Sequence, residues 1–209
     1  YGEDVISIGV DTWGVDFGLT DAYGRLLGIP YCYRDSRTNG IDVVSEGIMP
    51  QPQRYAIAGI QHLHFNSIYQ LLAESRLQPN ALAEAKQLLF IPDLLNYWLC
   101  GVARNEVTIA STSELLDAKT GQWSDELIGR FGLPRGIFGE LVEPGSVLGM
   151  LSPEVAAEVG SSGIRVVASP SHDTAAAVAA CPLRSADAVY ISSGTWSLMG
   201  VESANCHTS

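Results

Sequence analysis

Residues 169–174, which read Ser-Pro-Ser-His-Asp-Thr, place a histidine and a carboxylate where a strand should end and a helix begin. Ligand sites in α/β sheets lie beyond the carboxyl ends of strands. Asp173 would begin the helix, where the helix dipole favours an ionised carboxylate that can accept a proton from a hydroxyl group. A plain helix N-cap explains an Asp at this position equally well. The order Ser171-His172-Asp173 does not indicate a catalytic triad, because triad members meet in space and not in sequence.

Residues 192–195 form a second segment whose residue types could bind a ligand. Ser192, Ser193, Gly194 and Thr195 offer backbone N–H groups and hydroxyl groups without bulky side chains, between two expected strands. Such a turn can bind a phosphate group. An ordinary hairpin turn is the more frequent explanation of this pattern.

A third segment, residues 11–16, places Trp13 and Gly14 between the carboxylates of Asp11 and Asp16. The face of an indole can pack on the C–H side of a sugar while carboxylates accept hydrogen bonds from its hydroxyl groups. Packing in the core is the alternative for Trp13. A phosphate loop of the actin type is disfavoured here, because Trp13 stands where a glycine would let the backbone approach a phosphate.

Two further clusters have structural explanations. His62 and His64 are two residues apart, but no third ligand accompanies them, so no metal site is expected. Residues 64–67 could instead border a sugar pocket. Arg34, Asp35 and Arg37 form an internal ion-pair network or approach the ligand, and the structural role is slightly favoured.

The elements that must position these segments follow a mixed α/β order. We expect a β meander over residues 5–30 and a buried strand over 164–168. Helices are expected over 68–72, with Ser67 as the N-cap, and over 81–89, 93–99, 124–132, 152–160 and 175–180. Tyr97 and Trp98 should lie in the core, and strands over 190–193 and 196–201 should form a hairpin.

The amino-acid composition disfavours two classes of binding partner, nucleic acids and anionic membranes. The 209 residues include 12 Lys+Arg and 23 Asp+Glu, which gives a formal net charge of −11. Such an acidic chain is a poor candidate for nucleic-acid binding or for docking on an anionic membrane. No apolar run approaches the length of a membrane helix, and the four cysteines form no Cys-x-x-Cys pair. These features favour a cytoplasmic protein with free thiols.

Four segments, in this order, resemble the FGGY family of carbohydrate kinases. They read VDTWGVDF from residue 10, YRDSRT from residue 33, SHDT from residue 171 and SSGTWSLMG from residue 192. The resemblance implies an α/β fold of the ribonuclease-H-like, actin/hexokinase ATPase type, with a mixed sheet and flanking helices. It also implies two such domains with a cleft between them.

The resemblance further implies ATP-dependent phosphorylation of a ketose, with Mg²⁺ bridging the ATP phosphates. The expected substrate is L-rhamnulose, phosphorylated at its 1-hydroxyl group. Asp173 would be the catalytic base, and His172 and Thr174 would contact the sugar, as would Gly14. Thr195, with Gly194 beside it, would bind the ATP phosphates.

The domain organisation also follows from the resemblance. Residues 1–183 would form most of the N-terminal, sugar-binding domain without its first phosphate loop, and residues 184–209 the opening hairpin of the nucleotide-binding domain. The chain is therefore expected to be an internal fragment, which is inactive alone. Alternatives are another ketose kinase of the family, acting on L-fuculose or D-xylulose, a fragment that only binds sugar, and an actin-like ATPase domain. The oligomeric state stays open.

Overall fold

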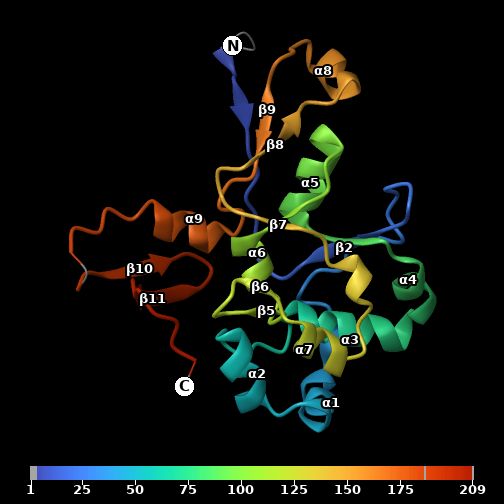
Figure 1. The fold of residues 1–209 in the computed structure, drawn as a ribbon, viewed down its shortest axis with the longest axis vertical. Coiled ribbons are helices and arrows are strands. Elements are labelled where there is room, and N and C mark those ends of the chain that lie inside the picture. The colour runs from blue at the N-terminus through green and yellow to red at the C-terminus, as the bar shows by residue number, and fades with distance from the viewer. Residues whose placement is uncertain (1–3, 186, 209) are drawn as a thin grey trace.

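The computed structural model describes residues 4–185 and 187–208 (Figure 1). Its upper part, in the view of Figure 1, contains a three-stranded mixed sheet in the order β1-β9-β8. β1 (Ser7–Ile8) is parallel to the central β9 (Arg165–Val167), and β8 (Val147–Met150) is antiparallel to β9. The apolar run over residues 164–168 thus forms the buried strand that its composition predicts. Mixed sheet and flanking helices confirm the expected α/β fold class.

The expected meander over residues 5–30 is wrong. β1 pairs with β9, whereas β2 (Phe17–Thr20) pairs antiparallel with β3 (Gln87–Phe90). The third expected strand contributes a single bridge between Thr20 and Leu26. All four residues of β2 are buried, so this strand has apolar neighbours on both faces and cannot lie at the edge of an exposed ribbon.

The helix expected over residues 81–89 is also only partly correct. α4 (Pro79–Glu84) ends early, and the following residues form strand β3. Leu88, Leu89 and Phe90 are fully buried, and periodicity cannot separate a strand buried on both faces from a buried helix.

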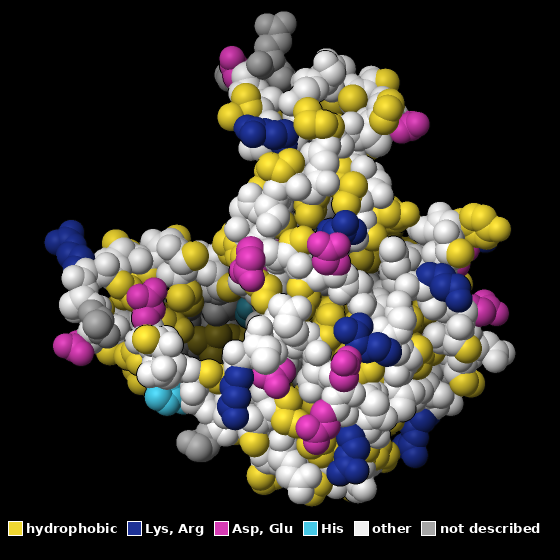
Figure 2. Space-filling view, viewed as in Figure 1, with side chains coloured by type: hydrophobic (Ala, Val, Ile, Leu, Met, Phe, Trp, Pro, Cys, Tyr) yellow, Lys and Arg dark blue, Asp and Glu magenta, His cyan; other side chains and the backbone are white. Residues whose placement is uncertain are grey.

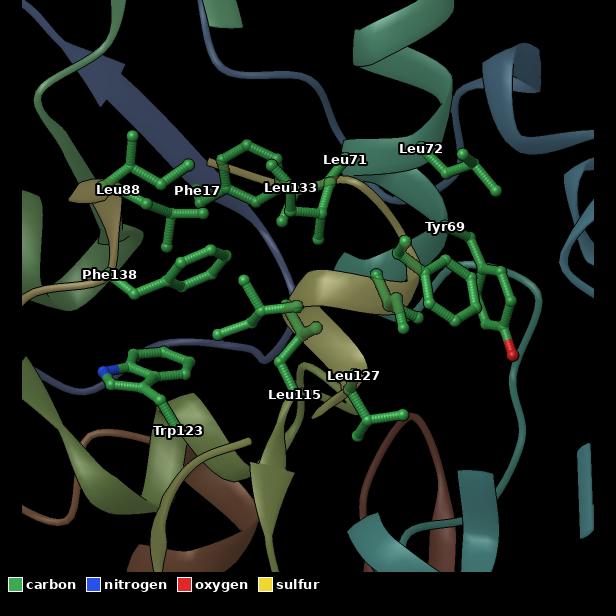
Figure 3. Close-up of a cluster of buried hydrophobic side chains, with 14 of the residues drawn as sticks. Phe17, Tyr69, Leu71, Leu72, Leu88, Leu115, Trp123, Leu127, Leu133 and Phe138 are labelled. Atoms are coloured by element: carbon green, nitrogen blue, oxygen red, sulfur yellow. The ribbon is translucent and has the colours of Figure 1, made fainter. Parts of the chain in front are cut away.

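A layer of helices covers the lower part of the molecule in Figure 1. Its members are α1 (Ile41–Ile48), α2 (Gln51–Ala58), α3 (Ser67–Leu77) and α7 (Asp125–Arg130). Figure 3 shows the main core, in which Leu71 of α3 and Leu127 of α7 lie with Phe17 and Leu88 from the β2–β3 pair. The core therefore fixes α3 against β2, immediately beside the segment that contains Trp13.

Most helix boundaries agree with the capping signals. The exception is α3, where Asn66 is the N-cap and the expected cap Ser67 is the first helical residue, whose hydroxyl group donates to the carbonyl of Val15. α5 (Ile91–Cys100) begins with Pro92 in its first turn and ends at Gly101 in the left-handed conformation. Ser124 caps α7, and Ser152 caps α8 (Pro153–Val159), as expected for N-cap serines. Trp98, however, is 49% exposed, so its expected place in the core is wrong.

Short elements complete the scaffold. β4 (Asn105–Glu106) runs parallel to β7 (Leu141–Val142) and leads directly into α6 (Val107–Ser111). β5 (Leu116–Asp117) pairs with β6 (Gln122–Trp123), and 3-10 turns occur at Ser36–Thr38 and Arg135–Ile137.

The C-terminal elements form an arm at the left of Figure 1. α9 (Asp173–Ala179) leads to the antiparallel hairpin of β10 (Val189–Ser193) and β11 (Ser197–Val201), which confirms the expected hairpin. Among the described residues, no helix is long and apolar enough to span a membrane.

Candidate active site

A cavity of about 670 Å³ lies between this arm and the body of the molecule. Figure 2 shows the surface hollowed at that place. All three candidate functional segments from the sequence line this cavity: Trp13 and Gly14, residues 172–174, and the hairpin turn with Gly194 and Thr195. The structure therefore brings together most of the site residues expected from sequence.

Backbone pairing joins the first two segments. Thr12 forms a parallel bridge with His172, the N–H of Thr12 donates to the carbonyl of Ser171, and the N–H of Asp173 donates to the carbonyl of Thr12, both at 2.9 Å. This pairing carries the β1–β9 register past the ends of the strands. The loop at the carboxyl end of β9 thus presents Asp173 beside Trp13.

Among the described residues that line the cavity, Asp173 is the only one with a carboxylate. His172, and not Asp173, is the N-cap residue of α9, so the structure does not favour the plain N-cap explanation. Oδ1 of Asp173 accepts hydrogen bonds from the backbone N–H of Thr174 at 2.5 Å and from its hydroxyl group at 3.1 Å. The Asp173 side chain is 56% exposed, which leaves the carboxylate accessible to a ligand.

His172 lies against this carboxylate, with Nε2 3.5 Å from Oδ1 of Asp173. Burial lowers the pKa of His172 below its usual 6.5, although the charges of Asp173 and Glu106 act in the opposite direction. The imidazole is therefore neutral near pH 7. A neutral imidazole does not form an ion pair with Asp173, and it can donate a hydrogen bond to a ligand or accept one from it.

A buried carboxylate, which the sequence did not reveal as important, holds this loop in place. Glu106 caps α6 and accepts a hydrogen bond from the N–H of Ser171 at 3.0 Å. It also accepts from the hydroxyl group of Thr108 at 2.6 Å, and that hydroxyl accepts from the N–H of His172 at 3.3 Å. The N–H of Glu106 donates to Asp93, whose pKa is raised well above its usual value by burial. The only sequence signal was a carboxylate directly before a short helix.

Gly14 and Val15 fix the direction of the opposite segment. A Cβ at Gly14 would lie 2.9 Å from Cγ2 of Thr112, so the backbone touches the end of α6. Val15 has a φ of 69°, which is a strained value for a β-branched residue. Hydrogen bonds from its N–H to Thr112 Oγ1 at 2.9 Å and from Ser67 Oγ to its carbonyl at 2.7 Å hold it there.

Trp13 is 47% exposed and lines the cavity, which excludes the core alternative. Asp11 is exposed but does not line the cavity, and Asp16 is buried beneath it, only 2% exposed. The structure therefore does not support the expectation that both carboxylates bind a sugar directly. Tyr33 and Phe65 also line the cavity, 5.0 Å apart between ring centroids. Phe65 lies in the segment 64–67 that the sequence offered as a border of the pocket, whereas Tyr33 was given no separate role.

The hairpin turn forms the other side of the cavity. Ser193 pairs with Ser197, and the N–H of Gly194 donates to the carbonyl of Trp196 at 2.8 Å. Gly194 and Thr195 are exposed. The turn therefore presents a hydroxyl group and backbone atoms to solvent at the cavity, as a phosphate-binding turn requires.

The remaining clusters have structural partners. His62 Nδ1 lies 2.7 Å from the hydroxyl group of Tyr69, and Arg37 forms an ion pair with Glu74 at 2.5 Å inside the protein. In the part of the chain that the structure describes, no group of three His, Cys, Asp or Glu residues could hold a metal ion.

Comparison with known proteins identifies the family to which this chain is similar. Residues 2–180 match the N-terminal domain of the FGGY family of carbohydrate kinases. A rhamnulokinase of Yersinia pestis is 46% identical over 197 residues, which are 94% of this chain and 40% of that protein. A rhamnulokinase of Bacteroides thetaiotaomicron is 45% identical over 201 residues, 96% of this chain and 41% of that protein. The chain thus spans about 40% of the length of these curated relatives.

Solved structures agree. A carbohydrate kinase from Novosphingobium aromaticivorans superposes with a TM-score of 0.83 at 26% identity, over 98% of this chain and 44% of that one. A xylulose kinase from Bifidobacterium adolescentis, at 12% identity, shares the fold with a TM-score of 0.75 over 94% of this chain and 47% of that one. Because the family match covers most of its length, the chain belongs to the FGGY family of carbohydrate kinases.

Proposed function

We propose that the full-length protein transfers the γ-phosphoryl group of ATP to the 1-hydroxyl group of L-rhamnulose in the cytoplasm, with Asp173 as the base. The observation that carries this proposal is the position of Asp173. Its carboxylate is exposed in a cavity with an indole on one side and a hydroxyl-bearing turn on the other.

Asp173 accepts the proton of the sugar hydroxyl group as the oxygen attacks the phosphorus atom. A strong base is not required, because phosphoryl transfer depends mainly on positioning and on neutralising charge. Asp173 is held by the backbone of Thr12, and the neutral imidazole of His172 beside it can orient a sugar hydroxyl group. Any bound Mg²⁺ would supply charge neutralisation at the ATP phosphates.

The other site residues divide between the two substrates. Gly14, Trp13 and Thr174 form the sugar side, where the indole face packs on C–H groups of the sugar. Thr195 and Gly194 form the phosphate side, with one exposed hydroxyl group and an exposed turn without a bulky side chain at Gly194. Residues 1–183 then form most of the sugar-binding domain and residues 184–209 begin the nucleotide-binding domain.

The choice of L-rhamnulose is supported by the rhamnulokinase relatives. The xylulose kinase among the structural neighbours keeps another ketose as the alternative. A coupled ADP-release assay on the full-length protein, with ATP, Mg²⁺ and a panel of L-rhamnulose, L-fuculose, L-ribulose, D-xylulose and glycerol, decides between them. Turnover dominated by L-rhamnulose supports the proposal. Turnover dominated by another ketose would overturn the substrate, and absence of turnover on all five would overturn the activity.

A further inference from the structure

One buried carboxylate holds two walls of the cavity. Oδ2 of Asp16 accepts a hydrogen bond from the indole Nε1–H of Trp13 at 2.7 Å and another from the backbone N–H of Tyr33 at 3.1 Å. Trp13 and Tyr33 both line the cavity, and they come from segments that are 20 residues apart in the chain (33 − 13). Asp16 itself does not line it.

The other oxygen of Asp16 connects to α3 and to a third aromatic wall. Oδ1 accepts from Nε2 of Gln70 at 3.1 Å, and the same Nε2 donates to the carbonyl of Phe65 at 3.0 Å. Oε1 of Gln70 accepts from the buried Arg37 at 2.8 Å, which fixes the orientation of the amide. Gln70 is almost fully buried, so this support is rigid.

The hydrogen bond between Trp13 and Asp16 is a main restraint on the indole, because the ring is only partly packed against the protein. Half of the Trp13 side chain faces solvent, and its N–H donates to an ionisable carboxylate, which gives a charge-assisted hydrogen bond. Burial raises the pKa of Asp16, and the hydrogen bonds from Trp13, Gln70 and Tyr33 oppose that shift. The neighbouring charge of Arg37 also favours the ionised form.

We infer that Asp16 is a positioning residue that determines sugar selectivity, by fixing the Trp13 indole and the Tyr33 backbone as two parts of the wall of the sugar site. This inference rests on the proposed function for the identity of the sugar. It replaces direct hydrogen bonding of Asp16 to the substrate with an indirect role through the aromatic walls.

The indole plane decides which C–H face of a ketose can pack, so a loosened indole should discriminate poorly between epimers. Asp16→Asn keeps the shape of the side chain, but its NH₂ group must face one of the three donors. We expect the ratio of kcat/KM for L-rhamnulose to that for L-fuculose to fall about tenfold, a loss comparable to one hydrogen bond to a charged group. KM for ATP should stay within about twofold, since the change does not reach the hairpin turn.

The test uses four variants of the full-length protein. Trp13→Phe keeps an aromatic ring but removes the donor, so Asp16→Asn should have little further effect on selectivity in the double variant. Asp21→Asn is the matched control, because among the described residues the Asp21 carboxylate bonds only to Tyr23 and Arg25, in an outer turn. Additive effects of Trp13→Phe and Asp16→Asn, or an unchanged selectivity ratio in Asp16→Asn, would overturn the inference.

A second measurement does not depend on catalysis. The indole N–H resonance of Trp13, assigned by its loss in Trp13→Phe, should exchange slowly with water in the wild-type protein. Its exchange should accelerate at least tenfold in Asp16→Asn and stay unchanged in Asp21→Asn. Equal exchange in Asp16→Asn and wild type would refute the positioning role, whether or not the protein phosphorylates a ketose. Absence of turnover with normal NMR behaviour would instead count against the proposed function alone.

Discussion

The two sides of the cavity are built differently. On the sugar side, residues 12–16 and 171–174 are held by hydrogen bonds to buried groups such as Asp16, Glu106 and Thr112. On the phosphate side, the turn at residues 194–196 is exposed and depends on the hairpin's own pairing and on one ring contact, 6.1 Å between the centroids of Phe65 and Trp196. Under the proposed function, the more firmly held side is the one where the sugar hydroxyl group and the base meet, as precise positioning of reacting groups requires.

The largest effect should follow from removing the base. Asp173→Asn in the full-length protein should lower kcat by about 10³-fold, within the range for loss of general-base catalysis. KM for L-rhamnulose should change by less than about threefold, because the amide retains an oxygen acceptor and a similar shape. Steady-state kinetics with ADP release measure both, and near-normal turnover would remove Asp173 from the mechanism.

A smaller effect, on the other substrate, should follow from Thr195→Ala. Loss of one hydrogen bond to a charged phosphate should raise KM for ATP by about 10-fold to 100-fold. Thr195→Ser keeps the hydroxyl group and should restore most of the affinity. Sugar binding, measured by calorimetry, should be the same in all three proteins, and a shared loss of sugar affinity would show that the two sides are not separable.

The hydrogen bonds that hold the loop before Asp173 can be weakened without changing Asp173 itself. Thr108→Val removes the acceptor for the N–H of His172 and one partner of Glu106, and we expect kcat to fall about tenfold. Thr108→Ser keeps the hydroxyl group and is the matched control. Equal loss of activity in both variants would indicate general destabilisation, which thermal unfolding would reveal as a parallel loss of Tm.

The smallest effect concerns acid pH. Burial lowers the pKa of His172, so acidification protonates the unfolded chain at this site before the folded one, and both folding stability and activity should decline as the pH falls below 6.5. A protonated His172 can also pair as a cation with the Asp173 carboxylate, 3.5 Å away, and compete with the sugar hydroxyl group for it. The decline in kcat should be severalfold and should flatten in His172→Gln. A pH–rate profile that is unchanged in this variant would assign the decline to another group.

Sequence reasoning located much of the site but little of its support. Chemical type and local position were enough for Trp13, Asp173 and Thr195, because each stands in a loop next to a predictable strand or helix. Cap residues such as Ser124 and Ser152 were equally readable, since their hydrogen bonds are local.

Contacts between distant segments account for what was missed. Asp16 looked like a ligand for the sugar because nothing local shows that Gln70 and Tyr33 cover it. The same limit explains why β2 was paired with the wrong neighbour, since its partner β3 lies some 70 residues away and resembled a helix. Glu106 went unnoticed because its partner Ser171 is 65 residues away.

A crystal structure of the full-length protein with L-rhamnulose tests the central claim most directly. The account predicts that the 1-hydroxyl oxygen lies about 3 Å from the Asp173 carboxylate, with the C–H face of the sugar on the Trp13 indole. It also predicts that Asp16 remains bonded to Trp13 and does not touch the sugar. A sugar bound outside this cavity, or with its 1-hydroxyl group turned away from Asp173, would contradict the account.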